Sequence, residues 1–161
     1  MNIDSKNITG NVSSNNDALF KDSNFEGFIV LFIHNFINDF TAVIGGLLFF
    51  IPTLIITSIN ATNMITVFVK LPPLIILLGI IPHGIFENPS SIFAIAGGIM
   101  LFKTEINVIK ALIKRESVKQ AFNDSEALVK DAILTVVIIF VLLLLAALIE
   151  TFITPVLLSG I

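Results

Sequence analysis

The amino-acid sequence predicts an all-α fold, a polytopic membrane helix bundle with about four spans. Hydrophobic residues make up 55% of the 161 positions, and the mean hydropathy is +0.99. Charged residues make up 13% of the chain, about half of the roughly 25% that is usual in soluble domains. Beyond residue 24, long apolar runs alternate with short polar segments, as expected for helices that cross a bilayer.

Composition also limits the chemistry that the chain can perform. It has no cysteine, which excludes disulfides, thiolate metal sites and cysteine nucleophiles. Its net charge of −3 is too small to indicate a nucleic-acid partner. No phosphate-binding loop is present, so any coupling to nucleotide hydrolysis would have to come from another protein.

The chain divides into a polar tail and a single membrane domain. Residues 1–24 are rich in Asn, Ser and Asp and lack apolar periodicity, so we expect them to be disordered. The membrane domain covers residues 25–161 and begins with a short apolar run at 25–40 that ends in polar residues. Phe28, Phe32 and Phe36 recur there every four positions, which predicts an amphipathic helix lying at the membrane interface.

Four spans are predicted after this interface helix, at about residues 41–59, 65–81, 89–102 and 132–154. A short polar turn at Asn60–Asn63 separates the first two spans. Gly45 and Gly46 would allow another helix to approach the first span closely. The third and fourth spans carry small residues that we expect to face one another: Gly97, Gly98, Ala146 and Ala147.

The segment Lys103–Asp131 holds six of the nine Lys and Arg residues, and Asn123-Asp124-Ser125 within it predicts a helix break. The positive-inside rule places this segment in the cytoplasm, and Lys70 at the start of the second span agrees. Both chain ends then lie outside. The apolar face of the segment indicates an amphipathic helix resting on the membrane, and a docking site for a soluble partner is the alternative.

The second and third spans are joined by Pro82–Pro89, where prolines, a glycine, a histidine and a carboxylate interrupt apolar sequence. We expect a re-entrant break that includes Gly84, with Asn88 and Pro89 as the N-cap and first residue of the next helix. Such a break is tolerated in a membrane only where protein or water satisfies its backbone. Ionisable side chains at this depth, here His83 and Glu87, indicate a functional site.

The predicted topology brings polar residues to one side of the membrane, because the first and second spans run in opposite directions, as do the third and fourth. We expect one outward-facing polar pocket formed by His34, Asn35, Asn38, Asp39, His83, Glu87 and Glu150.

Four roles are open for Glu87 and Glu150. These are hydrogen bonding that ties helix ends together, which we favour, a proton or ion pathway, metal binding with the two histidines, and catalysis. No His-Glu-x-x-His spacing and no Gly-x-Ser-x-Gly elbow is present in the sequence. We therefore assign no metal ligand, no catalytic residue and no cofactor.

Two motifs resemble those of a known family. Pro82-His83-Gly84 with Glu87 forms the first, and Ala146-Ala147 with Glu150 and Thr154-Pro155 forms the second. As a pair they resemble the stage II sporulation protein M family of integral membrane proteins. The resemblance covers roughly residues 25–155 and implies a membrane protein of the cell envelope. In spore-formers, the family's namesake works with peptidoglycan-remodelling partners.

The sequence also departs from that family. Asn35 is similar to an asparagine early in the family's pattern, but Asn60-Ala61 and Met64 stand where the family usually has glycines. The polar tail replaces an additional first span. We expect a non-catalytic integral membrane component of a cell-envelope complex in the cell membrane. Its partners would be the lipid bilayer and membrane or envelope proteins, a second copy of the chain among them. The alternative is a permease-like subunit that moves a solute or lipid with a partner ATPase or an ion gradient.

Overall fold

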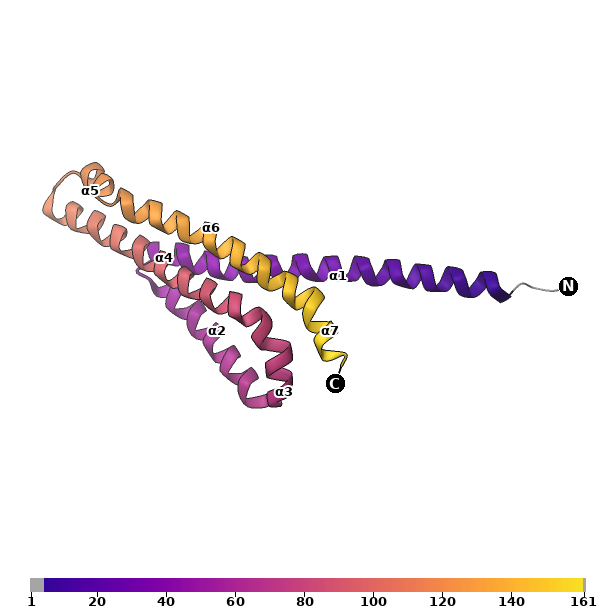
Figure 1. Cartoon of the computed structure of the whole chain (residues 1–161). Helices are drawn as coiled ribbons and strands as arrows, with labels where there is room; N and C mark the ends of the chain where they lie inside the picture. Colours follow the sequence, from indigo (N-terminus) through magenta and orange to yellow (C-terminus); the bar gives the residue numbers. More distant parts are fainter. Residues whose placement is uncertain (1–4, 161) are drawn as a thin grey trace.

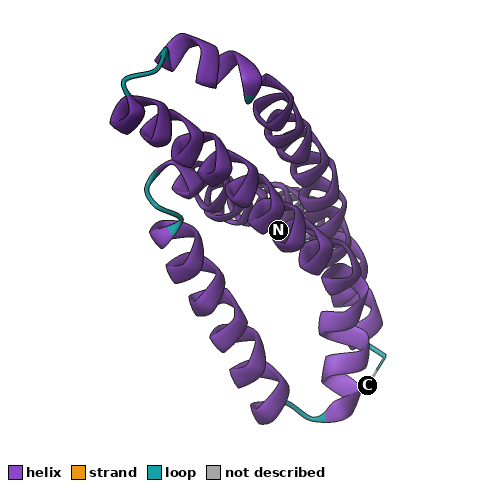
Figure 2. Cartoon of the chain, turned by 90° about the vertical axis from the view of Figure 1, so that its left-hand side faces the viewer, coloured by secondary structure: helices purple, strands orange, loops and turns teal. Residues whose placement is uncertain are grey.

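The computed structural model describes residues 5–160, with side chains from residue 25 onward, and every regular element in this range is helical (Figure 1). The four long helices are α1 (Ser5–Ile44), α2 (Ile51–Lys70), α4 (Ile81–Lys114) and α6 (Glu126–Leu148). The shorter elements are the 3₁₀ turn η1 (Gly45–Leu47), α3 (Pro73–Ile75), α5 (Val118–Asp124), α7 (Thr154–Leu158) and two π-helical segments, η2 (Ile76–Ile80) and η3 (Ile149–Ile153). Short loops join the elements (Figure 2).

Four stretches are long and apolar enough to cross a membrane: Phe25–Leu47, Ile51–Lys70, Pro73–Lys114 and Glu126–Leu158. The prediction of an all-α membrane bundle with four spans is therefore confirmed. The boundaries of the individual spans differ from those predicted, and the differences decide which residues meet.

The centre of the bundle is formed by α4 and α6, with α1 packed against both of them. Its core consists of five side chains that are at most 2% exposed: Ala42, Val43, Ala94, Ile139 and Leu143. Two of the five are alanines, which let helix backbones approach closely. Close backbone approach is the main source of helix association in lipid, where apolar burial gives little driving force.

The phenylalanines of α1 belong to this packing. Phe28, Phe32 and Phe36 stack along the helix, and the ring of Phe140 on α6 meets Phe32 edge-on at a centroid distance of 5.2 Å. Residues 25–40 are thus one part of a helix of spanning length, which corrects the prediction of a separate interface helix. The four-residue spacing of aromatic rings suits a packing face between helices as well as a membrane surface, so the spacing alone does not decide between them.

The expected disordered tail is also corrected over Ser5–Asn24, which is helical and continuous with the apolar part of α1. The N-terminal half of α1 extends beyond the other helices (Figure 1). The segment has no proline, and each residue added to an existing helix gains one hydrogen bond without a new nucleation step. Residues 1–4 of the predicted tail lie outside the described residues.

A tight turn at Gly45–Phe50 divides the predicted span 41–59 between α1 and α2. Phe49 and Phe50 both adopt left-handed backbone conformations, with φ of 54° and 63°. The backbone N–H of Phe49 donates a hydrogen bond of 3.1 Å to the Glu105 carboxylate, and the Phe50 ring lies 5.9 Å from that of Phe102. These contacts hold an unfavourable turn against α4.

After this turn, α2 leans away from the bundle. Only Thr53 is buried among its residues, and residues 61–70 are all exposed. The helix runs through Asn60–Asn63, where the sequence predicts a turn. Its threonines can remain helical because their hydroxyls donate to the carbonyl one turn earlier, as Thr62 does to Ser58 at 2.8 Å.

The end of α2 at Lys70 divides the predicted span 65–81 and changes the position of this lysine. The chain leaves the helix at Leu71 and Pro72 before α3 begins. Lys70 lies at the far end of a helix about 30 Å long, whose first turn is near Phe102 and Glu105. Lys70 therefore lies at the opposite end of the bundle from Lys103–Asp131. It does not support the positive-inside assignment, contrary to the prediction.

The predicted re-entrant break at Pro82–Pro89 is absent, because α4 runs without interruption from Ile81 through both prolines. The segment 89–102 is an inner part of α4, and Asn88 and Pro89 do not start a helix. Each π-helical segment stands shortly before a proline: η2 before Pro82 and η3 before Pro155. A proline ring clashes with the carbonyl four residues earlier, and a wider π-helical turn gives that carbonyl room.

The basic segment Lys103–Asp131 is not a separate loop helix. Its first part, through Lys114, continues α4, and Arg115 ends that helix in a left-handed conformation. The short helix α5 follows and ends at Asp124, within the predicted break at Asn123-Asp124-Ser125. The Asn107 side chain on α4 donates to the Ser125 hydroxyl at 3.0 Å, which fastens the connection to α4.

Candidate functional site

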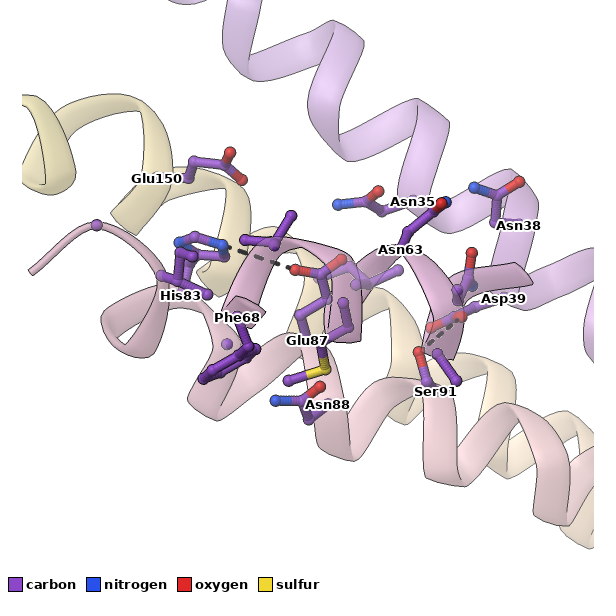
Figure 3. A pocket seen from close by; sticks show the side chains of 18 of the residues that line it. Asn35, Asn38, Asp39, Asn63, Phe68, His83, Glu87, Asn88, Ser91 and Glu150 are labelled. Atoms are coloured by element: carbon purple, nitrogen blue, oxygen red, sulfur yellow. Dashed lines mark hydrogen bonds and ion pairs between the residues drawn. The ribbon is translucent and has the colours of Figure 1, made fainter. Parts of the chain in front are cut away.

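A cavity of about 760 Å³ lies between α1, α2, the first turns of α4 and the η3–α7 segment (Figure 3). All of the residues predicted for a polar pocket line it: His34, Asn35, Asn38, Asp39, His83, Glu87 and Glu150. Three separate parts of the chain contribute them. Nearly all of the lining residues belong to the stretches that are long and apolar enough to cross a membrane.

The α1 side of the cavity contains one buried and one exposed polar pair. Asp39 is 4% exposed, and its carboxylate accepts hydrogen bonds from the hydroxyls of Ser90, which is fully buried, and Ser91 on α4. One turn away, the His34 ring and the Asn38 amide lie 3.3 Å apart. Asp39 thus fastens α1 to α4, whereas His34 and Asn38 remain available to the cavity.

The α4 side presents His83 and Glu87, one helical turn apart. The His83 Nε2 and Glu87 Oε2 atoms are 3.8 Å apart, and the Glu87 side chain is 39% exposed (Figure 3). The other ring nitrogen of His83, Nδ1, is buried and has no hydrogen-bond partner among the described residues. Glu87 is therefore weakly held by the protein.

The η3–α7 side contributes Glu150 and Thr154. Glu150 lies in the π-helical segment η3, and Thr154 follows it as the first residue of α7. Thr154 is 8% exposed, and its hydroxyl has no hydrogen-bond partner within residues 25–160. π-helical segments inside helices occur frequently at functional sites, since the extra residue redirects the side chains around it.

The wall formed by α2 was not foreseen from the sequence. Asn60 and Asn63 line the cavity beside the apolar side chains of Met64, Val67 and Phe68. The sequence argument placed Asn60–Asn63 in a short polar turn between two spans. The missing signal was the i, i+3 and i+4 spacing that places Asn60, Asn63, Met64 and Val67 on one helical face.

The chemical character of the cavity is acidic and rich in amides. Asp39, Glu87 and Glu150 supply three carboxyl groups, and no Lys or Arg occurs among the described residues that line it. Among the same described residues, no group of three or more His, Asp or Glu side chains is placed to hold a metal ion. The three carboxyl groups come from three different elements, α1, α4 and η3.

The comparisons with known proteins give one match. The family model of stage II sporulation protein M matches residues 3–155. The chain belongs to this family. Comparison with curated proteins gives no match, and comparison with solved structures gives none.

In this member of the stage II sporulation protein M family, the two motifs behind the resemblance meet at one cavity. His83, Gly84 and Glu87 from the first motif and Glu150 and Thr154 from the second all line it. Each motif also contains or adjoins a π-helical segment next to a proline. The residues that carry the resemblance therefore form a single structural unit.

Ser90 and Ser91 were missed as members of the site. The sequence argument found no Gly-x-Ser-x-Gly elbow and gave these two serines no role. Their hydroxyls instead satisfy the Asp39 carboxylate across the α1–α4 contact. The available signal was Asp39 itself, since a carboxyl group inside an apolar span requires hydrogen-bond donors from another helix.

The small residues pack, but with other partners than expected. A Cβ on Gly97 would lie 2.4 Å from the Thr135 hydroxyl, and one on Gly98 would lie 2.9 Å from the Ala42 carbonyl oxygen. Ala146 and Ala147 are 2% exposed but are not among these nearest neighbours. The antiparallel register of α4 and α6 places Thr135, one of the buried residues of α6, beside Gly97.

Proposed function

We propose that this chain is a non-catalytic integral membrane component of a cell-envelope complex, located in the cell membrane. The observation that supports the proposal is the position of α2. This helix is long and apolar enough to span, yet only Thr53 near its start is buried. Helices in a bilayer associate by close packing and interhelical hydrogen bonds. A helix that leaves its own bundle therefore has a face available for another membrane protein.

Two further features fit such a role. The first half of α1 extends beyond the bundle, and at the other end α4, α5 and the start of α6 together extend past α1 and α2 around the basic turn at Arg115 (Figure 1). Both extensions offer surface to partners outside the bilayer. The sporulation role of the family's namesake is not part of the proposal.

The test is site-specific photo-crosslinking in the native membrane. A photoreactive phenylalanine analogue replaces Ile65 or Val69 on α2, which are 64% and 78% exposed, and Ile133 on α6, 61% exposed, serves as the control. We expect a recurrent adduct with one membrane or envelope protein from the α2 positions and not from Ile133. Lipid adducts alone at both α2 positions, together with purification of the chain without partners in mild detergent, would refute the proposal.

A permease-like subunit is the second candidate, and the cavity of about 760 Å³, lined mostly by residues of the spanning stretches, favours it. A scaffold needs no such space. Reconstitution into liposomes separates the two candidates. A permease-like subunit should give ion or solute flux that Glu87→Gln reduces, whereas a scaffold should give no flux above protein-free liposomes.

A further inference from the structure

The main cavity has a smaller neighbour with which it shares walls. This second cavity, about 210 Å³, lies between α2 and the first turns of α4. Five residues line both cavities: Met64, Phe68, Ile80, Gly84 and Asn88. The remaining lining of the small cavity is Ile81, Ile85 and Pro89, and Ile81 and Ile85 are 40% and 61% exposed. An apolar passage between α2 and α4 therefore leads from the polar cavity towards the outer face of the bundle.

The passage exists because α2 and α4 barely pack against each other. Residues 61–70 of α2 are all exposed, and Gly84 on α4 presents no side chain to the gap. Gly84 is buried, but a Cβ added there would meet only the Asn88 amide, at an ordinary contact distance of 3.5 Å, so the position leaves room beside α4. In a bilayer, a space of this kind between two spans is filled by an acyl chain or by another helix.

The polar cavity indicates which head group would accompany such a chain. Its volume falls within the range of about 300–1,000 Å³ that is usual for organic ligands. The carboxyl groups of Glu87 and Glu150 line it, without any Lys or Arg among the described lining residues. The side-chain amides of Asn35, Asn38, Asn60 and Asn63 line it as well. These groups suit a head group with a positive charge and several hydrogen-bonding atoms.

We propose that the two cavities together bind one phospholipid that bears a primary ammonium group, with its head in the polar cavity and an acyl chain between α2 and α4. The ammonium lies near Glu87 and Glu150, and the phosphodiester lies towards the amides of Asn60 and Asn63. Anionic lipids lack a partner for their charge in this cavity. If the chain is a permease-like subunit, this lipid is its cargo, and that part of the proposal rests on the permease function. The binding itself requires neither flux nor partner proteins.

The test is lipid titration of the purified full chain in detergent, followed by native mass spectrometry. The probes are phosphatidylethanolamine, phosphatidylcholine and phosphatidylglycerol with identical acyl chains. We expect phosphatidylethanolamine to bind about tenfold more tightly than phosphatidylglycerol, a ratio that corresponds to about 1.4 kcal/mol, because only its ammonium group can donate a charged hydrogen bond to the carboxylates. Phosphatidylcholine, whose ammonium has no N–H to donate, should bind more weakly than phosphatidylethanolamine. Equal binding of all three lipids would overturn the proposal.

Variants locate the site. Glu87→Gln combined with Glu150→Gln should weaken phosphatidylethanolamine binding about tenfold and leave phosphatidylglycerol unchanged. The matched control, Glu116→Gln with Asp131→Asn, removes two exposed carboxylates outside the cavity and should change neither affinity. Gly84→Leu should fill the passage and weaken binding of the lipid. Wild-type affinity in the double glutamate variant would contradict the proposal.

A further titration distinguishes a lipid ligand from a soluble amine. Glycerophosphoethanolamine carries the same head group without acyl chains, and it should bind far more weakly, since the passage contributes nothing to it. Binding as tight as that of the lipid would overturn the lipid assignment. If α2 yields no protein adduct but the lipid titration succeeds, the proposed complex fails while the lipid site stands.

Discussion

The Asp39 carboxylate accepts hydrogen bonds from two adjacent hydroxyls on another helix, Ser90 and Ser91, and thereby joins α1 to α4 inside the bundle. Asp39→Ala should lower stability by about 1–3 kcal/mol, because it leaves the fully buried Ser90 hydroxyl without this acceptor. Asp39→Asn keeps a carbonyl oxygen and should cost less. Thermal unfolding in detergent measures both, with the exposed Asp131→Asn as control. Equal melting temperatures for Asp39→Ala and the wild type would contradict this role.

Glu87 should behave differently from Asp39, although both are carboxyl groups in the same cavity. Its side chain is 39% exposed, and its contact with His83 is 3.8 Å long. Glu87→Gln and Glu87→Ala should each cost less stability than Asp39→Ala, because the 3.8 Å contact with His83 is looser than the hydrogen bonds that Asp39 accepts from Ser90 and Ser91. The melting temperature in detergent checks this. A large fall in melting temperature for Glu87→Ala but not for Glu87→Gln would instead support the prediction that Glu87 ties helix ends together by hydrogen bonds.

Gly46 lies where α1 turns into α2, directly against the backbone of α4. A Cβ there would be 2.1 Å from the carbonyl oxygen of Gly98, which cannot move aside because it is backbone. Gly46→Ala should therefore separate the two segments and destabilise the bundle by at least roughly 1–3 kcal/mol. The matched control is Gly27→Ala on α1, where a Cβ meets nothing within 4 Å. This control variant should be neutral or more stable by about 0.5–1 kcal/mol. Thermal unfolding measures both variants, and equal changes in melting temperature would refute the close contact at Gly46.

Phe49 is exposed and left-handed, with φ of 54°. Phe49→Gly should raise stability by up to about 1 kcal/mol, because glycine adopts this conformation without the clash that an L side chain suffers. The backbone hydrogen bond to Glu105 remains in this variant. Phe50→Gly relieves the same strain but loses the ring contact with Phe102, so it should gain less. A lower melting temperature for Phe49→Gly would show that the contacts of the Phe49 ring stabilise the protein by more than its backbone strain destabilises it.

The orientation in the membrane can be tested with single cysteines, since the chain has none of its own. We expect an impermeant thiol reagent to label Ser14→Cys and Lys70→Cys in intact cells and to leave Ser117→Cys unlabelled. Lys70 is included because the structure places it at the end of α2 away from Glu105. Labelling of Ser117→Cys with protection of the other two would reverse the orientation. Lysis before labelling serves as the control for accessibility.

The sequence predicted the members of the polar cavity better than the helices that hold them. Polar and ionisable side chains in apolar runs are few, so parity of the spans was enough to bring Glu87 and Glu150 towards the same side. The boundaries failed where the local signals were ambiguous. Pro82 and Pro89 predicted a break, yet the π-helical segment η2 accommodates Pro82 and α4 continues through Pro89. Asn60–Asn63 reads as a turn, yet the chain turns at Gly45–Phe50 instead.

By itself, the sequence determined that this is a helical membrane protein with four spans and with polar groups inside its apolar runs, because hydropathy and length decide whether a helix can cross a bilayer. It also determined the family, through two short motifs. Only the tertiary structure decided that Asp39 is paired with Ser90 while Glu87 is nearly free, and that α2 leaves the bundle to open a cavity. The reason is that partner choice between helices depends on the register of small residues such as Gly46 and Gly98, which no local pattern encodes.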